Sequence, residues 1–299
     1  MTTTQKPFVL AVGAGGQFAS LILPELKRRG VRVRGLVRDP ARAAHARSLG
    51  AAEIAVGDLG DGASMAAALE GIEAVFYIAP AALPDEAAVG RAVVGAAKEA
   101  GVRRFVFSSL IHPTLGELPH HTAKIPVEDA VLNSGMEFCL LHPTMFFQNF
   151  ARSWPSVLET GVLAEPWSTE TRFTRVDYRD VAEVAAIALT EERLVNGTFE
   201  LCAEGNLDRG DVAALIGEVL GRPIRAEKSH APPGSKPSPL QPMLDWYDAH
   251  GLLGNPLTLR AILGREPRTL RAYFEELAQA SHGDVRVAPR GAPREALAT

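Results

Sequence analysis

The chain has 299 residues, 46% of them hydrophobic, which is enough for one large domain, or a large domain and a smaller one, around a sizeable core. Its formal net charge of -4 leaves no basic excess to neutralise a phosphate backbone, so a nucleic-acid partner is disfavoured. The N-terminus lacks the pattern of a signal peptide or membrane span, and Cys139 and Cys202 lie in apolar runs, so we expect a cytoplasmic protein without a disulfide.

The chain opens with the order strand, glycine turn, helix. The apolar run Phe8 to Val12 predicts a buried strand, and "GAGGQFA" follows it at once, before a helical pattern of leucines. In such a turn Gly13 permits a tight bend, Gly16 lets the backbone approach a pyrophosphate, and Ala19 is small enough for close helix packing. The helix start then directs free N–H groups at phosphates. We predict a dinucleotide-binding turn, with a plain strand-to-helix connection as the alternative.

Short apolar runs then alternate with alanine-rich helical stretches. The runs that predict strands are Val31 to Val37, Glu53 to Val56, Ala74 to Ile78, Arg104 to Phe107 and Glu137 to Leu141. The stretches that predict helices are Ala41 to Ser48, Ser64 to Leu69, Ala87 to Ala100 and Ala123 to Leu132. This alternation predicts an α/β fold with a doubly wound parallel sheet, which binds ligands at the carboxyl ends of its strands.

Polar residues follow several of these strands. The second strand ends at Arg38, where folds that prefer NAD place a carboxylate, whereas an arginine pairs with a 2′-phosphate. NADP is therefore favoured, although the adjacent Asp39 keeps NAD as a less favoured alternative. Asp58, in "GDL" after the third strand, either receives the adenine amino group or serves as a cap or turn residue. Ser108 and Ser109 end the fifth strand beside the expected nicotinamide position.

The second half of the chain has a less regular pattern from residue 151 until "VDYRDVAEVAAIALTEE" predicts a helix, with Asp180 and Glu183 at the spacing of a capping box. A strand, a helix, a proline-rich loop and a last helix follow, at Gly197 to Leu201, Arg209 to Leu220, 229 to 242 and Leu270 to Ala280. We predict a nucleotide-binding core over 1–150 and a mixed region over 151–282. That region completes the sheet and forms a small α+β substrate subdomain, and a poorly ordered tail covers 283–299.

Taken in chain order, the GxxGxxA turn, "VRDP", "GDL", "IAP", "RRFVFSS", "HTAKIPVEDAVLNSGMEFCLLHPTMFFQN" and "VDYRDVAEVAA" resemble the NmrA-like group of atypical short-chain dehydrogenases, over roughly residues 7–220. The resemblance implies a Rossmann domain with a small C-terminal subdomain. It also implies that the cofactor is contacted by residues of these motifs, namely Gly13, Gly16, Gln17, Phe18, Arg38, Asp58, Leu59, Ala79, Ser108, Lys124, Pro143, Met145 and Phe146.

Classical members of the superfamily use a Tyr-x-x-x-Lys pair, in which the lysine orients the ribose and the tyrosine exchanges a proton with substrate. Here His120 occupies the tyrosine position and Lys124 keeps the lysine. Since histidine exchanges protons near neutral pH, we take Lys124 and His120 as the candidate catalytic residues. The alternatives are a surface lysine and a structural histidine. His112, His120 and His121 share one loop, but no cysteine or carboxylate stands at ligand spacing, so no metal site is expected.

The family resemblance includes enzymes as well as proteins that only sense the cofactor. Our leading hypothesis is an NADPH-dependent reductase of a small, largely apolar carbonyl or enone compound. An NADP-binding sensor and a redox-neutral isomerase are the alternatives. Met145, Phe146 and Phe147 suit an apolar substrate but equally suit a core, and Trp154, Trp167 and Phe173 are further candidates for the same pocket. The sequence leaves the substrate and the oligomeric state open.

Overall fold

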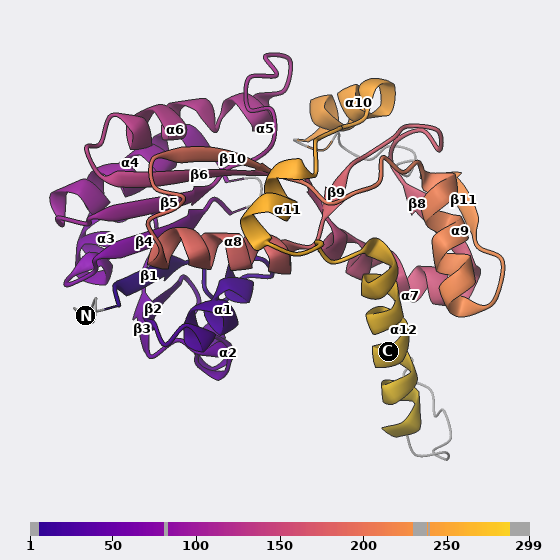
Figure 1. The fold of residues 1–299 in the computed structure, drawn as a ribbon, viewed down its shortest axis with the longest axis horizontal. Coiled ribbons are helices and arrows are strands. Elements are labelled where there is room, and N and C mark those ends of the chain that lie inside the picture. Colours follow the sequence, from indigo (N-terminus) through magenta and orange to yellow (C-terminus); the bar gives the residue numbers. More distant parts are fainter. Residues whose placement is uncertain (1–5, 81–82, 230–237, 239, 288–299) are drawn as a thin grey trace, which may run out of the picture.

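The computed structural model describes residues 6–80, 83–229, 238 and 240–287. Seven strands form one sheet in the order β10-β6-β5-β4-β1-β2-β3, and every neighbouring pair is parallel (Figure 1). They are β1 (Phe8–Val12), β2 (Arg32–Val37), β3 (Glu53–Val56), β4 (Ala74–Ile78), β5 (Arg104–Ser108), β6 (Glu137–Pro143) and β10 (Gly197–Leu201). The order reverses between β1 and β4, which confirms the predicted doubly wound Rossmann sheet and marks where such sheets bind ligands.

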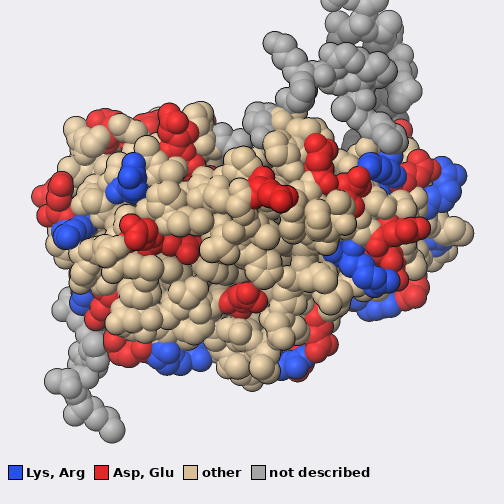
Figure 2. Space-filling view, turned by 90° about the horizontal axis from the view of Figure 1, so that it is seen from above, with Lys and Arg blue, Asp and Glu red and all other residues tan. Residues whose placement is uncertain are grey.

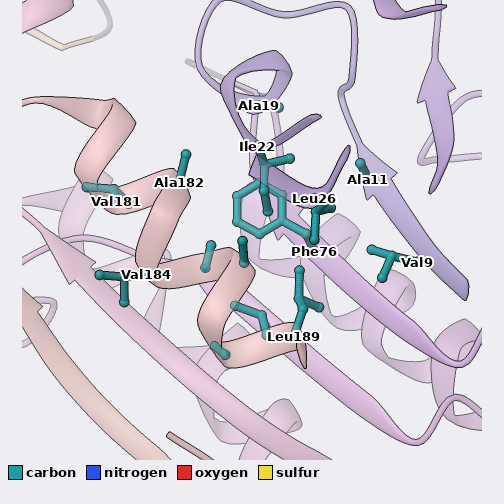
Figure 3. Packing of buried hydrophobic residues seen from close by; sticks show 14 of the residues in the cluster. Val9, Ala11, Ala19, Ile22, Leu26, Phe76, Val181, Ala182, Val184 and Leu189 are labelled. Carbon is teal, nitrogen blue, oxygen red and sulfur yellow. The ribbon is translucent and has the colours of Figure 1, made fainter. Parts of the chain in front are cut away.

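Helices cover both faces of this sheet. One layer contains α1 (Ile22–Arg28), α2 (Ala43–Leu49) and α8 (Tyr178–Thr190), and the other contains α3 (Gly62–Leu69), α4 (Glu86–Glu99) and α6 (Ile125–Leu132) (Figure 1). Figure 3 shows apolar side chains of α8 meeting those of the sheet and α1, among them Val181, Val184, Leu189, Ile22, Leu26 and Phe76. Small alanines on α8 let it lie close to the strands, so it is almost entirely buried.

Most of the remaining helices and strands lie beyond the carboxyl ends of the sheet strands, to the right in Figure 1. These are α5 (Pro119–Thr122), β7 (Met145–Phe146), α7 (Phe150–Thr160), β8 (Val162–Glu165), β9 (Arg175–Val176), α9 (Arg209–Leu220), β11 (Arg225–Lys228), α10 (Gln241–His250) and α12 (Leu270–Val287). The short helix α11 (Leu257–Leu263) instead packs on α8 and β10. Two small parallel sheets, β7-β9 and β8-β11, join distant parts of this region. Residues 288–299 of the predicted tail, and most of the proline-rich loop, lie outside the described residues.

The stretch after residue 150 is regular, contrary to the sequence prediction. It forms α7, which contains Pro155 within the helix. The proline hid a helical pattern, because Phe150, Trp154 and Val157 lie on one buried face at helical spacing. Tertiary packing of this face compensates for the backbone hydrogen bond that proline cannot donate.

The predicted capping box of α8 is wrong. Asp177 is the N-cap and accepts a hydrogen bond from the Arg179 N–H at 2.8 Å. Asp180 lies inside the first turn, fully buried, where it accepts from the Arg268 N–H at 2.7 Å and the Arg265 guanidinium at 2.8 Å. These ion pairs fasten the segment before α12 to α8, and sequence spacing alone does not distinguish a cap from such a long-range anchor.

Three general features of the described chain concern its cysteines, its surface charge and its helices. Both cysteines are buried and free, as predicted. Figure 2 shows acidic and basic side chains interspersed over the described part of one face, with a broad uncharged area between them. No helix in the described ranges is both long and apolar enough to cross a membrane.

Candidate functional site

The glycine turn after β1 is built as a cradle. Gly13 has a φ of +72°, a left-handed conformation that glycine adopts without steric cost, and its carbonyl accepts from the Gly16 N–H at 2.8 Å. A β-carbon on Gly16 would lie 3.1 Å from that same oxygen, and the small Ala19 packs against Gly13. Over the described ranges, the N–H groups of Gln17 and Phe18 donate no hydrogen bond. The turn therefore offers free donors at the edge of the sheet, as a phosphate site requires.

Two arginines lie near this turn, after β2. Arg38 is exposed and has no carboxylate partner among the described residues. Arg42, which the sequence analysis did not single out, lies against the turn. A β-carbon added to Gly15 would come within 2.5 Å of the Arg42 β-carbon. The Asp39 carboxylate is engaged, accepting from the Ala41 N–H at 2.9 Å. This edge thus holds two arginines and a carboxylate that already accepts one hydrogen bond.

The contacts of Asp58, Leu59 and Ala79, the predicted cofactor-binding residues after β3 and β4, are ordinary turn and packing contacts. Asp58 forms a turn, with Oδ1 accepting from the Gly60 N–H at 2.8 Å and its own N–H donating to Ser64 Oγ at 3.1 Å. This is the turn role that the sequence analysis weighed against contact with adenine. Leu59 is half-buried against the α3 layer, and Ala79 is half-buried directly after β4.

Phe18, Phe146 and Tyr178 form an aromatic cluster beside the end of β5. The ring centroids of Phe18 and Phe146 are 4.7 Å apart, and those of Phe146 and Tyr178 are also 4.7 Å apart. The Tyr178 hydroxyl donates to Ser108 Oγ at 3.2 Å, and burial raises the pKa of Tyr178. Tyr178 was missed from the sequence because a helical "VDYRD" gives no signal for a contact with a strand 70 residues earlier.

Gln148 ties three distant segments together. Its carbonyl accepts from Gln17 Nε2 of the glycine turn at 3.3 Å, and its side chain donates to Asp177 Oδ1 at 2.7 Å and accepts from the Tyr178 N–H at 2.9 Å. Pro143, the buried last residue of β6, precedes it. The two motifs that carry the family resemblance in the middle of the chain, "HPTMFFQN" and "VDYRD", are therefore neighbours of the glycine turn.

Lys124 is buried in an ion pair that the sequence did not predict. The helix expected over 123–132 begins two residues later, as α6, and Lys124 lies in the turn between α5 and α6. Its Nζ donates to Oε1 of Glu86, at the start of α4, and both side chains are almost inaccessible. His120 Nδ1 lies 4.0 Å from Glu86 Oε2. Burial, and then the charge of Lys124, lower the pKa of His120 to about 4, so His120 is a neutral imidazole at pH 7.

A second buried group of polar side chains lies at the ends of β5 and β6. Ser109 Oγ donates to Glu128 Oε1, and His142 Nε2 lies 3.0 Å from the same oxygen without the alignment of a hydrogen bond. Glu128 follows Lys124 by one helical turn, so both belong to the helix segment that borders these strand ends. Glu128 and His142 were not singled out from the sequence.

An apolar cluster lies between the loop after β5 and α10. It contains Ile111, Leu115, Leu118, Met145, Trp167, Phe173, Cys202, Met243, Leu244, Trp246, Tyr247 and Leu252. Trp167 and Phe173, two of the candidates for the substrate pocket, contact each other in this cluster, with ring centroids 4.8 Å apart. Trp154 does not belong to it, because it stacks on Phe274 of α12 at 5.8 Å in a separate cluster.

His121 fastens α10 to the loop before α5. Its Nδ1 lies 3.0 Å from the His112 carbonyl, which can only accept, so Nδ1 carries the proton and Nε2 accepts from the Tyr247 hydroxyl at 2.8 Å. Burial lowers the pKa of His121 to about 4.

We expect His121 to make the fold less stable in acid. The unfolded chain binds a proton at His121 below pH 6.5 and the folded chain only near pH 4, so stability is complete above pH 6.5 and is lost as the pH falls toward 4. Between pH 7 and pH 5 this histidine contributes a loss of about 2 kcal/mol. Urea denaturation should show a larger total loss in wild type and in the exposed-histidine control His45→Gln, because His120 adds to it, and a loss about 2 kcal/mol smaller in His121→Gln. Equal losses in all three proteins would contradict the assignment.

Comparisons with known proteins agree with this architecture. The model of the NmrA-like family matches residues 5–244. An NAD(P)H azoreductase of Xenophilus azovorans is 32% identical over 222 residues, covering 73% of this chain and 75% of the relative. Quinone oxidoreductase 2 of Escherichia coli is 28% identical, covering 72% and 76%.

Solved structures share the fold across most of the chain. The NADPH complex of an Escherichia coli NADPH-dependent quinone oxidoreductase superposes with a TM-score of 0.79 at 23% identity, covering 91% of this chain and 99% of that one. Triphenylmethane reductase of Citrobacter sp. superposes with a TM-score of 0.81 at 18% identity and the same coverage. From the match of the family model over residues 5–244, we conclude that the chain belongs to the NmrA-like family.

Proposed function

We propose that the protein is an NADPH-dependent reductase that transfers hydride to a small, largely apolar substrate such as a quinone, an enone or another conjugated carbonyl compound. The observation that carries this proposal is the placement of three features along the carboxyl edge of one sheet: the glycine turn after β1, Arg38 after β2, which has no carboxylate partner among the described residues, and the buried Lys124, which precedes the helix whose Glu128 contacts Ser109 at the end of β5. The named functions of the azoreductase and quinone oxidoreductase relatives support it.

The residues present fit a bound NADP. The Gly13 to Phe18 turn would hold the pyrophosphate, Arg38 and Arg42 the 2′-phosphate, and Lys124 the ribose next to the nicotinamide. Asp39 already accepts one hydrogen bond from the Ala41 N–H of its own turn, which leaves it less available to a ribose hydroxyl. When bound, the cofactor supplies the hydride, and the chain's residues bind it, orient it and exclude water.

We expect Arg38→Ala to weaken NADPH binding by roughly 10- to 100-fold and to leave NADH binding nearly unchanged, since a charged hydrogen bond to phosphate contributes about 1.5 to 3 kcal/mol. Calorimetric titration of both cofactors measures this. Arg47→Ala is the matched control, because Arg47 is also exposed but lies on α2. Equal NADPH and NADH affinities in wild type, or an equal loss for both cofactors in Arg38→Ala, would contradict a 2′-phosphate site.

The substrate side is proposed to lie among residues 151–282, with the apolar cluster around Trp167 and Phe173, against which Met145 packs, as its floor. Aromatic and thioether side chains suit a flat, conjugated molecule. Steady-state NADPH oxidation with a panel of quinones, azo compounds, enones and aldehydes tests the reductase proposal. Oxidation above the protein-free rate with at least one member supports it.

A cofactor sensor is the second candidate, and one observation favours it. The tyrosine position holds His120, which is a neutral imidazole at pH 7 and therefore a poor proton donor to a substrate. Tight NADPH binding without turnover of any panel member would favour the sensor over the reductase.

A further inference from the structure

The ion pair between Glu86 and Lys124 joins two helices of one layer. Glu86 is the first residue of α4 and Lys124 immediately precedes α6. The helices approach closely one turn further on, where a β-carbon on Gly90 would come within 2.4 Å of Val127 Cγ2. Only glycine fits at that position, so the packing itself brings the carboxylate and the ammonium group together.

Glu86 has one strong partner. Among the described residues, Lys124 is the only cation that its carboxylate contacts directly, and the neutral His120 stands off at 4.0 Å. The Tyr77 hydroxyl is buried close by and has no hydrogen-bond partner among the described residues, and burial together with the Glu86 charge raises the pKa of Tyr77. The side chains of Glu86 and Lys124 are 5% and 7% exposed, so water contributes little to satisfying either charge.

Resting on the reductase function proposed above, we propose that Glu86 is a positioning residue that holds Lys124 as a fixed positive charge against the cofactor, and that the proton for the substrate comes from water. Lys124 Nζ donates to Glu86 Oε1, so at least one of its three N–H donors is directed at the carboxylate and not at the substrate. The reaction is balanced without a proton from a protein side chain. NADPH gives a hydride to the substrate and becomes NADP⁺, and the resulting oxyanion of a quinone or enone takes one proton from water.

The ion pair between Glu86 and Lys124 is first tested by its effect on the stability of the fold, without cofactor. We compare urea midpoints of wild type, Glu86→Gln, Lys124→Met and the double variant, with Glu99→Gln at the exposed end of α4 as control. Each single variant leaves one buried charge unpaired, so both are expected to lower the midpoint, and the double variant is expected to be more stable than either. Single-variant losses that simply add in the double variant would overturn the pair.

The role of Glu86 is then tested on NADPH affinity and turnover. Glu86→Gln is expected to lower NADPH affinity or kcat at least tenfold in wild type and less than twofold in the Lys124→Met background, and Glu86→Asp is expected to recover part of the loss. Lys124→Arg keeps a positive charge that cannot be given up as a proton, so it should retain at least tenfold more turnover than Lys124→Met.

Two results would overturn the role of the pair. One is a Glu86→Gln protein with wild-type NADPH affinity and turnover, and the other is a Lys124→Arg protein as inactive as Lys124→Met. If wild type neither binds nor oxidises NADPH, the reductase proposal fails and this role with it, while the stability cycle still reports separately on the ion pair.

Discussion

Replacing Lys124 by methionine is expected to lower the rate of NADPH oxidation about 100-fold or more, a scale typical of losing a group that acts at the reacting centre. Methionine is similar in length and fills the same buried space, but it offers no charge to the cofactor ribose. The substitution also leaves the Glu86 carboxylate without its partner. Turnover is measured with the best substrate of the panel at saturating NADPH.

The control for this variant is Lys98→Met on the exposed surface of α4. The double variant Glu86→Gln/Lys124→Met separates lost chemistry from a buried unpaired carboxylate, because it restores charge balance without restoring the lysine. A Lys124→Met protein that reacts as fast as wild type would show that this lysine has no part in the reaction.

Replacing Gly16 by valine is expected to abolish measurable NADPH binding, a loss of at least 100-fold. The new β-carbon would stand 3.1 Å from the Gly13 carbonyl, and the side chain would occupy the exposed turn that we propose as the pyrophosphate site. Since the position is exposed, the substitution does not enter the core, and the far-ultraviolet circular dichroism spectrum should be unchanged.

Gly95→Val is the matched control, because a β-carbon on Gly95 in α4 meets no atom within 4 Å. It should bind NADPH as wild type does. A folded Gly16→Val protein with wild-type affinity would mean that the phosphates bind elsewhere and that the turn is a plain connection between a strand and a helix.

The sheet was predictable because its signals are local. Each strand from β1 to β6 is a short apolar run followed by a turn, and the bend at Gly13 needs a residue that tolerates positive φ. The pair β7-β9 was missed because each strand has only two residues, and the pair β8-β11 was missed because β11, "RAEK", is largely polar and exposed and gives no apolar run. The helix α7 was missed because Pro155 obscured its period.

The residues that complete the candidate site were missed for a different reason. The Glu86 carboxylate pairs with a lysine 38 positions later, and Tyr178 bonds a serine 70 positions earlier. An acidic residue at a helix start is ordinarily explained by the helix dipole, so Glu86 gives no distinct signal. Only the packing of α4 on α6 turns it toward Lys124.

A single-turnover experiment tests the central claim most directly. Enzyme loaded with NADPH deuterated at the transferred position of nicotinamide C4 is mixed with the best quinone or enone of the panel, and the absorbance of the reduced nicotinamide is followed. The account predicts a fast loss of that absorbance, slowed by the deuterium and slowed further in Lys124→Met. With a carbon acceptor, the deuterium should appear in the product. Tight binding of NADPH with no loss of its absorbance for any panel member would contradict the reductase account.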